Sequence, residues 1–168
     1  EALPYIQRFA GATFVVKYGG SFMDSPDEAV RTGVARDVVF LEAVEINPVV
    51  VHGGGKRINK ALAAAGVESR FVNGLRYTDA ATVEIVDRVL STEINPEIVA
   101  LINSVGGVAK GIAGTEIFTC KKHAPHESNG EDYGFVGEVI GVNTAPLEEC
   151  IAHGITPVIS PTARDADG

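Results

Sequence analysis

The sequence predicts an α/β fold: a three-layer αβα sandwich with a mainly parallel, open sheet and a β-hairpin. Short apolar, β-branched runs alternate with segments of helical periodicity along the 168 residues, which is the pattern of parallel strands joined by helices. Two of these runs end abruptly in glycines. No linker, repeat or low-complexity segment divides the chain, so we expect residues 1–168 to form one structural unit.

The first half of the chain is expected to contain two strands and two helices. Residues 48–51 are apolar throughout, as expected of a central parallel strand that is buried on both faces. The segment Ser25-Pro26-Asp27-Glu28 has the pattern of a capping box with proline at the first helical position. The expected elements are a strand over 13–17, a helix from this box to about Ile46, a strand over 48–51, and a helix over 56–65 that ends at Gly66.

The second half continues with helices and then changes to short strands. Thr78 is a candidate N-cap for a helix over 80–92, and Asn95-Pro96-Glu97 restarts a helix that ends at Gly106-Gly107. Residues 117–121 and 135–142 flank a segment with the turn pair Asn129-Gly130, which predicts a β-hairpin arm. A short helix over 146–153, closed by Gly154, and a last buried strand over 156–160 complete the expected order.

The overall charge argues against two classes of partner. The formal net charge is −8 and the pI is near 4.9, so we expect neither nucleic acid nor an anionic membrane as a partner. No apolar run approaches the roughly 18 residues of a membrane-spanning helix. The chain has 2 cysteines, which argues against a disulfide scaffold and fits a reducing cytoplasm.

Two glycine turns follow predicted strands and indicate a site for anions. Lys17-Tyr18-Gly19-Gly20 ends the first strand, and His52-Gly53-Gly54-Gly55 ends the second. The helix after each turn presents free N–H groups and a dipole that favour a negative charge. Because the carboxyl ends of parallel strands meet at one edge, we expect both turns to serve one site for phosphate or carboxylate groups. Glycines that only allow tight packing of helix on strand are the structural alternative.

Two cations are candidates for that site. Lys17 could neutralise the charge of a transferring phosphoryl group, or it could simply extend from the strand end into solvent. Arg76 lies in Asn73-Gly74-Leu75-Arg76-Tyr77-Thr78, a loop before a predicted helix. It could clamp a carboxylate with two hydrogen bonds or form an ordinary surface salt bridge.

Other chemical interpretations have less support. Neither G-x-x-x-x-G-K-[ST] nor G-x-G-x-x-G occurs, so the standard nucleotide loops do not apply. An HGGG sequence also forms the oxyanion hole of some α/β-hydrolases, but no serine here has the G-x-S-x-G context. Tetrahedral zinc sites usually have tighter, paired spacing, so we expect no metal site at Cys120-x-x-His123-x-x-His126 and Cys150-x-x-His153.

Together these motifs resemble the amino acid kinase family, and within it the acetylglutamate kinases. The resemblance extends over almost the whole chain, and VHGGG with NGLR-T in this order and at this spacing is specific to that branch. The segments that carry it are Glu1-Ala2-Leu3-Pro4-Tyr5-Ile6, Val16–Gly20, Asn47–Gly55, Val72–Thr78, Asn95–Val99, Gly134–Val139 and Ile155–Pro161.

The resemblance implies ATP-dependent phosphorylation of the γ-carboxylate of N-acetyl-L-glutamate, the second step of arginine biosynthesis, with Mg²⁺ accompanying ATP. By resemblance, Lys17 is the catalytic residue that steadies the transferring phosphoryl group. The same resemblance assigns phosphate binding to Gly19 and Gly20, substrate binding to Gly53 and Gly54, and the substrate's α-carboxylate to Arg76. The hairpin that carries Phe135, Val136 and Gly137 resembles a lid over the substrate.

The two ends of the sequence differ from the family pattern. Family members usually continue into an Asn-x-Asn-Ala-Asp segment and a nucleotide-binding half, whereas this sequence stops at Gly168. We therefore expect a substrate-binding lobe without the C-terminal nucleotide-binding lobe, which would not turn over by itself. Residues 1–9 resemble the end of a helix that interlaces dimers into hexamers in arginine-inhibited relatives. Arginine inhibition and a homo-oligomer, dimer or hexamer, are the corresponding hypotheses.

Two alternatives stay open. A module that binds N-acetyl-L-glutamate or a related amino acid without catalysis would carry the same substrate residues. A kinase of the same family with another acidic substrate, such as aspartate, is the second alternative, although Arg76 in its NGLR context favours acetylglutamate.

Overall fold

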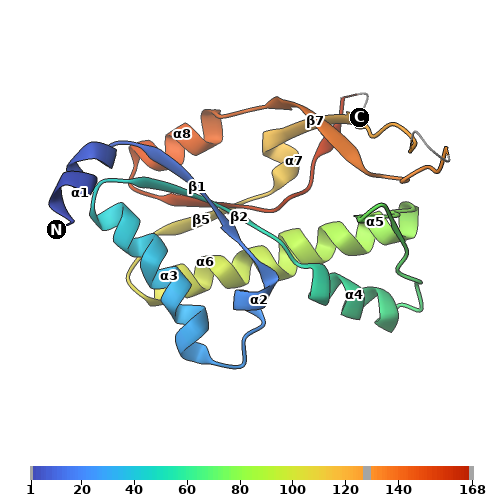
Figure 1. Ribbon diagram of the computed structural model, residues 1–168, viewed down its shortest axis with the longest axis horizontal. Helices are drawn as coiled ribbons and strands as arrows, with labels where there is room; N and C mark the ends of the chain where they lie inside the picture. Colours follow the sequence, from blue (N-terminus) through green and yellow to red (C-terminus); the bar gives the residue numbers. More distant parts are fainter. Residues whose placement is uncertain (1, 127–129, 167–168) are drawn as a thin grey trace.

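A parallel sheet lies at the centre of the computed structural model, which describes residues 2–126 and 130–166 (Figure 1). Within these ranges the sheet has four strands in the order β1-β2-β8-β5. β2 pairs in parallel with β1 on one side and with β8 on the other, which confirms its predicted central place and the predicted α/β class. The strand bounds are β1 Thr13–Tyr18, β2 Asn47–His52, β8 Thr156–Ile159 and β5 Ala109–Ile112.

Helices cover both faces of the sheet, as the predicted three-layer arrangement requires (Figure 1). On one face, α3 (Glu28–Ala43) and α6 (Asn95–Ser104) share a core with the strands that includes Ala35, Val38, Val50 and Ile102. On the other face, α7 (Gly114–Ile117) and α8 (Ala145–Ala152) enclose a second core of Val49, Ile112, Ile117, Cys150 and Ile159.

The alternation of side chains along β1 and β2 determines which face each one reaches. Val49 and Val50 belong to different cores, because successive residues of a strand point to opposite faces. Lys17 pairs in register with Val51, which packs against the α7–α8 core. Tyr18 belongs to the α3–α6 core. Two consecutive residues of β1 therefore point to different layers of the molecule.

The predicted capping box is wrong in detail, because α3 begins after Asp27 and not at Pro26. The Asp27 carboxylate accepts a hydrogen bond from the N–H of Ala29 at 2.8 Å, and its negative charge suits a helix N-terminus. The helix ends at Ala43, before the predicted end at Ile46. Glu45 has a φ of 63°, a left-handed conformation that a helix cannot contain.

Thr78 is not the cap of the next helix. α5 (Ala80–Asp87) begins after Asp79, whose carboxylate accepts a hydrogen bond from the N–H of Thr82 at 2.8 Å. The Thr78 hydroxyl donates instead to the carbonyl of Arg76 at 2.9 Å. Thr78 therefore stabilises the loop that carries Arg76, while the stronger acceptor caps the helix.

The predicted break before Pro96 does not occur. A π-helical segment over Arg88–Ile94 joins α5 to α6 without interruption, and the N–H of Asn95 donates to the carbonyl of Leu90. Proline lacks an N–H and its ring would collide with the carbonyl four residues earlier in a regular helix. The wider π turns place that carbonyl differently, so the helix continues through Pro96.

Two glycine helix ends are confirmed. Gly66 follows α4 (Gly55–Ala64) with a φ of +70°, and Gly154 follows α8 with a φ of +65°. Both residues hold the left-handed conformation that ends helices. The remaining short elements in the described ranges are α1 Leu3–Phe9, α2 Gly20–Met23, β3 Phe71–Val72 and β4 Leu75–Arg76.

The predicted hairpin arm is confirmed. β6 (Phe118–Lys122) pairs antiparallel with β7 (Gly137–Val142), and β9 (Arg164–Asp165) adds a parallel strand on the other side of β6. Of the predicted turn pair, Gly130 has a φ of +68° and Asn129 lies outside the described residues, as do Glu1 and Gly168. In Figure 1 the arm lies beyond the carboxyl ends of the central strands, at the same end of the molecule as α4 and the start of α5.

A search for membrane-spanning segments covered the described residues. In these ranges no helix combines the length and the apolar character needed to cross a bilayer.

We predict opposite effects for alanine at two helical glycines. Gly33 lies inside α3, and a Cβ built there meets no atom within 4 Å, so Gly33→Ala should raise the free energy of unfolding by about 0.5–1 kcal/mol. A Cβ at Gly114 would lie under 3.0 Å from backbone atoms of Ser160 and Thr162, so Gly114→Ala should lower it by about 1–3 kcal/mol. Urea unfolding of both variants measures the two changes, and equal effects would contradict the packing described here.

Candidate functional site

The two glycine turns lie next to each other at the carboxyl edge of the sheet. β1 and β2 are parallel and in register, with Tyr18 opposite His52. The N–H of Gly53 donates to the carbonyl of Tyr18 at 3.1 Å, so the pairing extends one residue beyond β2. The turn that begins at Gly19 and the turn that begins at Gly53 therefore start side by side, as the sequence predicts for a shared site.

Each turn leads directly into a helix. α2 begins at Gly20 and α4 begins at Gly55, with Gly54 at its N-cap. The first N–H groups of a helix have no partner within it and favour an anion. Packing also explains the glycine at position 54, because a Cβ there would lie under 3.0 Å from the side chains of Leu90 and Ile94. At Gly53 a Cβ would meet nothing within 4 Å, so tight packing does not explain that glycine.

Lys17 is exposed and lies on the sheet face that also carries α7 and α8. Among the described residues, its ammonium group has no ion pair and no hydrogen bond. An unpaired lysine one residue before the end of β1 leaves a positive charge beside the two glycine turns. This is the arrangement expected of a group that neutralises a bound anion.

A buried hydrogen-bonded pair supports the second glycine turn. His52 is 2% exposed, and its Nδ1 lies 3.0 Å from the carbonyl oxygen of Gly53. Its Nε2 lies 3.3 Å from Nδ2 of Asn95, which also donates to the carbonyl of Val158 at 2.8 Å. A carbonyl only accepts, so Nδ1 carries the proton and Nε2 accepts from the amide. The ring is therefore neutral, and burial lowers the pKa of His52 below its ordinary value of 6.5.

Sequence reasoning placed His52 at this edge but missed Asn95, which it treated only as part of a helix restart. A Cβ at Gly111 would lie under 3.0 Å from Oδ1 of Asn95, so β5 needs a glycine at that position to admit the amide. The signal in the sequence was a polar residue between apolar helix positions, but its partners lie on strands distant in the chain.

Arg76 forms hydrogen bonds with neutral side chains and not the surface salt bridge that was the alternative prediction. Its guanidinium donates to Oδ1 of Asn59 at 2.6 Å and to the hydroxyl of Ser69. The same group lies over the ring of Phe71, 4.7 Å from the centroid. Across the described ranges no acidic side chain pairs with Arg76, and partial burial lowers its pKa. The guanidinium is thus oriented by neutral groups and its charge is available to a carboxylate.

The loop that follows Arg76 joins the arm. Thr78 donates its N–H to the carbonyl of Tyr133 at 3.0 Å, and Phe135 donates its N–H to the carbonyl of Thr78 at 2.6 Å. A Cβ at Gly134 would lie under 3.0 Å from the carbonyl of Thr78, which explains the glycine there. Arg70, which precedes β3, adds an ion pair of 3.2 Å to Glu131 of the arm. The structure therefore brings the predicted carboxylate clamp and the predicted lid together.

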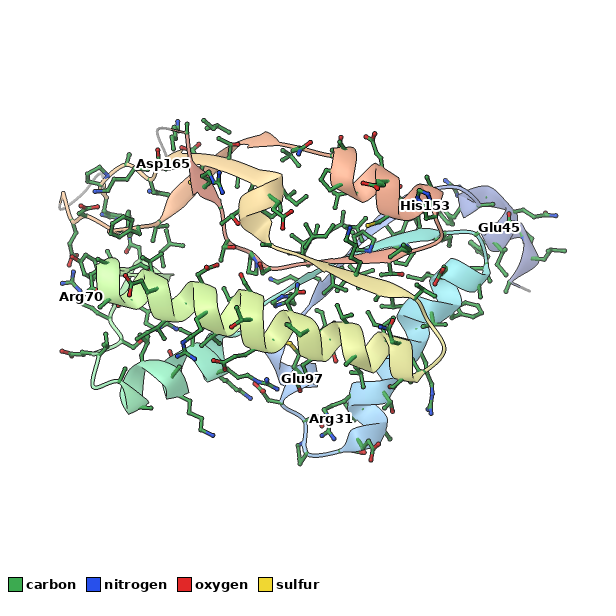
Figure 2. All side chains as sticks on the ribbon, turned by 180° about the vertical axis from the view of Figure 1, so that it is seen from behind. Arg31, Glu45, Arg70, Glu97, His153 and Asp165 are labelled. Carbon is green, nitrogen blue, oxygen red and sulfur yellow. The ribbon has the colours of Figure 1, made fainter. Side chains whose placement is uncertain are left out.

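The cysteine and histidine motifs are not brought together. Figure 2 shows His153 at the opposite end of the molecule from Arg70, which pairs with the arm. His123 packs edge-on against Tyr133 at 4.8 Å within the arm, and Nδ1 of His153 lies 2.7 Å from the carbonyl oxygen of Glu149. In the part of the chain that the structure describes, no group of three or more His, Cys, Asp or Glu side chains could hold a metal ion.

With this geometry established, comparison with known proteins assigns the family. The amino acid kinase family matches residues 12–168 of the chain. The chain belongs to this family.

Other members of the amino acid kinase family with curated names are similar over the whole chain. Acetylglutamate kinase of Thermosynechococcus vestitus is 51% identical over 168 residues, and acetylglutamate kinase of Thermoanaerobacter sp. (strain X514) is 48% identical over 168 residues. In each case the matched region is 100% of this chain and 55% of the relative. The chain therefore spans about half the length of the curated relatives that it matches.

Solved structures support the amino acid kinase fold. N-acetylglutamate synthase from Neisseria gonorrhoeae, complexed with coenzyme A and N-acetyl-glutamate, superposes with a TM-score of 0.81 at 22% identity and covers 100% of this chain and 38% of its own. An isopentenyl phosphate kinase superposes with a TM-score of 0.56 at 13% identity, over 92% of this chain and 59% of its own. At such identities the likeness concerns the fold alone.

We predict that His52 makes the stability of the chain depend on pH. Its folded pKa is lowered from 6.5, so the unfolded chain binds more protons than the folded chain between the lowered value and about 6.5. The free energy of unfolding should therefore rise with pH through this interval, and the contribution of His52 should be fully present above about pH 6.5.

His52→Asn tests this dependence, because the Asn amide replaces Nδ1 as donor to Gly53 and does not titrate. Urea unfolding between pH 5 and 7.5 should show a shallower rise for this variant than for the unmodified chain. His153→Asn is the control for loss of an exposed histidine. Parallel curves for His52→Asn and the unmodified chain would contradict the neutral buried ring.

Proposed function

We propose that this chain binds N-acetyl-L-glutamate in an enzyme that phosphorylates the γ-carboxylate of that substrate with ATP. The observation that carries the proposal is a pair of cationic side chains without acidic partners in the described ranges, one beside the glycine turns and one bonded to Asn59 of α4, the helix that follows the second turn. Lys17 stands unpaired beside both turns, and Arg76 is oriented by neutral groups next to the arm. The acetylglutamate kinases that are 48–51% identical to the chain support the choice of substrate.

Each group has a role that follows from its chemistry. Both reacting groups are anions, so the reaction requires alignment and neutralisation more than covalent help. Arg76 binds the α-carboxylate of the substrate, and Gly53 and Gly54 border the substrate. The N–H of Gly54 donates to it, because the N–H of Gly53 already donates to the carbonyl of Tyr18. Gly19 and Gly20 donate to the phosphates, and Lys17 neutralises charge on the transferring phosphoryl group.

Mg²⁺ and ATP belong to the proposal as well. Mg²⁺ commonly keeps several waters and is held largely by the substrate phosphates, where it would neutralise phosphate charge. The chain's own part at the phosphates is limited to Lys17 and the N–H groups of Gly19 and Gly20.

The arm is proposed as the lid over the substrate. Phe135 is 65% exposed although its backbone is hydrogen-bonded to Thr78 beside Arg76. An exposed aromatic side chain at this place can cover an acetyl group and exclude water from the charged groups beneath it.

The N-terminal helix is proposed to join copies of the chain. α1 exposes Leu3 by 63% and Tyr5 by 65%, an apolar surface that a homo-oligomer of dimeric or hexameric form would cover. Sensitivity to arginine is part of the same proposal.

We predict that the acetyl group and Arg76 both determine affinity. Calorimetric titration of the chain should show binding of N-acetyl-L-glutamate and at least tenfold weaker binding of glutamate. Arg76→Lys keeps the charge but loses the bidentate geometry and should weaken binding about tenfold, whereas Arg76→Gln should weaken it by about 100-fold. Arg36→Gln, at an exposed position of α3, is the matched control and should bind normally.

Three results would count against this proposal. Equal affinity for glutamate and N-acetyl-L-glutamate would contradict the assignment of N-acetyl-L-glutamate as the substrate. Preferred binding of aspartate would favour a different acidic substrate. An unchanged affinity of Arg76→Gln for N-acetyl-L-glutamate, with cooperative unfolding retained, would show that Arg76 does not bind the carboxylate.

We predict that Lys17 contributes to the affinity for phosphate and not to the affinity for N-acetyl-L-glutamate. Methionine matches the length of the lysine stem without its charge, so Lys17→Met should weaken binding of magnesium pyrophosphate by about tenfold. Binding of N-acetyl-L-glutamate should change by less than about threefold, because Lys17 is assigned to the other ligand. Nuclear magnetic resonance titration of the ¹⁵N-labelled chain follows both ligands at the amides of Gly19, Gly20, Gly53 and Gly54. A loss of substrate binding with unchanged pyrophosphate binding would reverse the assignment.

A further inference from the structure

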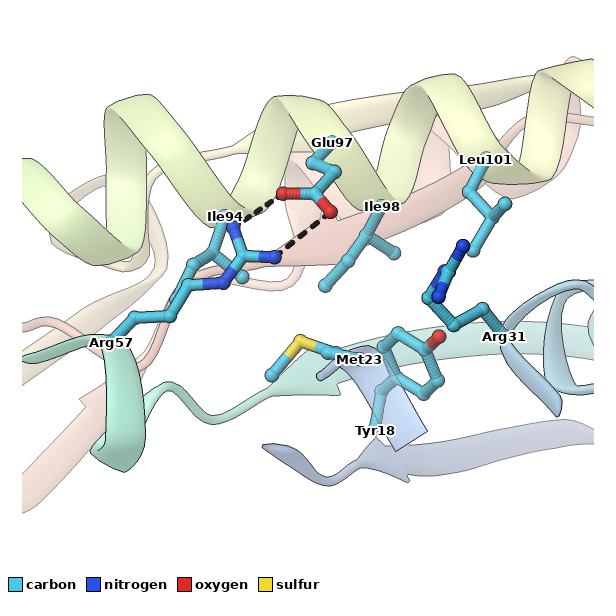
Figure 3. Close-up of a pocket in the computed structure, with 8 residues that line it drawn as sticks. All are labelled: Tyr18, Met23, Arg31, Arg57, Ile94, Glu97, Ile98 and Leu101. Carbon is cyan, nitrogen blue, oxygen red and sulfur yellow. Dashed lines mark hydrogen bonds and ion pairs between the residues drawn. The ribbon is translucent and has the colours of Figure 1, made fainter. Parts of the chain in front are cut away.

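A second pocket lies on the α3–α6 face, next to α2 and α4, the helices that follow the two glycine turns. Its volume is about 140 Å³. Figure 3 shows α6 on one side of it and the end of β1 with α2 on the other. The pocket is lined by Tyr18, Met23, Arg31, Arg57, Ile94, Glu97, Ile98 and Leu101.

The Tyr18 hydroxyl is the unusual group in this pocket. Tyr18 is 5% exposed, and its hydroxyl is one of two buried side-chain polar atoms without a hydrogen-bond partner in the ranges that the structure describes. Buried polar groups almost always have a partner, and an unpaired one costs about 1–3 kcal/mol. Figure 3 shows this hydroxyl directed toward the guanidinium end of Arg31. The geometry thus leaves a donor unused inside the pocket.

Two arginines and one carboxylate line the pocket. Arg31 donates to the carbonyl of Ser25 and is not paired with an acidic side chain in the described ranges. Arg57 donates to both oxygens of Glu97, one at 2.9 Å, and to Asp24 at 3.1 Å. Arg57 is thus shared by Glu97 and Asp24, whereas Arg31, which lines the pocket with Tyr18, has no acidic side chain within ion-pair distance in the described ranges.

The protonation state of Tyr18 agrees with this electrostatic environment. Burial, and then the negative charge of Glu97, raise the pKa of Tyr18 above its ordinary value of 10. The hydroxyl is thus protonated at neutral pH and can donate to a bound anion.

The rest of the lining is apolar. Met23, Ile94 and Ile98 are nearly fully buried, and Leu101 closes the pocket along α6. An apolar cavity of about 150 Å³ is large enough for benzene, whereas a water molecule takes about 30 Å³. The pocket therefore has about the volume that accepts a single ring or a branched chain.

We propose that this pocket binds a small monocarboxylate with an apolar body, such as an aromatic or branched-chain acid. The carboxylate accepts from the Tyr18 hydroxyl and pairs with Arg31. The apolar body packs on Met23, Ile94 and Ile98. Such a ligand supplies the missing partner of the hydroxyl and the missing counter-charge of Arg31 at once. It differs from the proposed substrate, which is more polar and carries two carboxylates.

Benzoate is the probe, and benzamide is its neutral control of the same shape. Titration of the ¹⁵N-labelled chain with benzoate should shift the amides of Tyr18, Met23 and Ile98. Benzamide should bind at least about tenfold more weakly because it lacks the charge that Arg31 recognises. The same titration in Arg76→Gln should be unchanged, which separates this pocket from the proposed substrate site.

Two matched pairs of variants assign the contacts. Tyr18→Phe should weaken benzoate binding about tenfold without lowering the midpoint of thermal unfolding, since the hydroxyl has no partner in the unliganded chain. Tyr5→Phe, at an exposed tyrosine, is the control and should change neither the affinity for benzoate nor the midpoint of thermal unfolding. Arg31→Gln should weaken binding by about tenfold or more, and Arg36→Gln on the same helix should not.

Several outcomes would overturn the proposal. No shifts at these residues with millimolar benzoate would mean that the pocket holds water alone. Equal binding of benzoate and benzamide would remove the role of Arg31. Shifts at pocket residues that follow protein concentration rather than probe concentration would mean that a second copy of the chain covers the pocket.

Discussion

The architecture of this chain depends on one buried amide, that of Asn95. Its nitrogen donates to the ring of His52 at the end of β2 and to the backbone carbonyl of Val158 in β8. Its oxygen occupies the space that Gly111 of β5 leaves open. Buried polar groups need such partners, and satisfying all of them allows one arrangement of helix and strands. The π-helical segment that accommodates Pro96 ends where Asn95 begins α6.

This constraint acts on the candidate site through a short series of bonds. Asn95 orients the ring of His52, and the ring donates to the carbonyl of Gly53. The His52 ring therefore fixes the carbonyl of Gly53, while the N–H of Gly53 is fixed by the carbonyl of Tyr18. On the same edge, Leu90 and Ile94 of the π-helical segment pack so closely against Gly54 that no side chain fits there. The packing of Leu90 and Ile94 thus favours glycine at position 54.

Successive side chains of β1 point to opposite faces of the sheet, so Lys17 and Tyr18 lie in different environments. Lys17 reaches the α7–α8 face as an exposed, unpaired cation, whereas Tyr18 reaches the α3–α6 face and is buried. One step along a strand therefore links the proposed phosphate site to the second pocket. Both places hold a polar group that the chain itself does not satisfy.

The sequence by itself determined the parallel α/β class, the central place of β2, the arm and the glycine edge, because strand and glycine patterns are local and strong. It misplaced the caps of α3 and α5, since Ser25, Thr78 and the neighbouring aspartates all have the chemistry of a cap. It also predicted a break before Pro96 that packing of α6 on the sheet overrides. The partners of Asn95 lie 43 and 63 residues away in the chain, and Asn59 lies 17 residues from Arg76. Only the tertiary structure brings such residues together, because hydrogen bonds and pockets depend on distances in space and not on order along the chain.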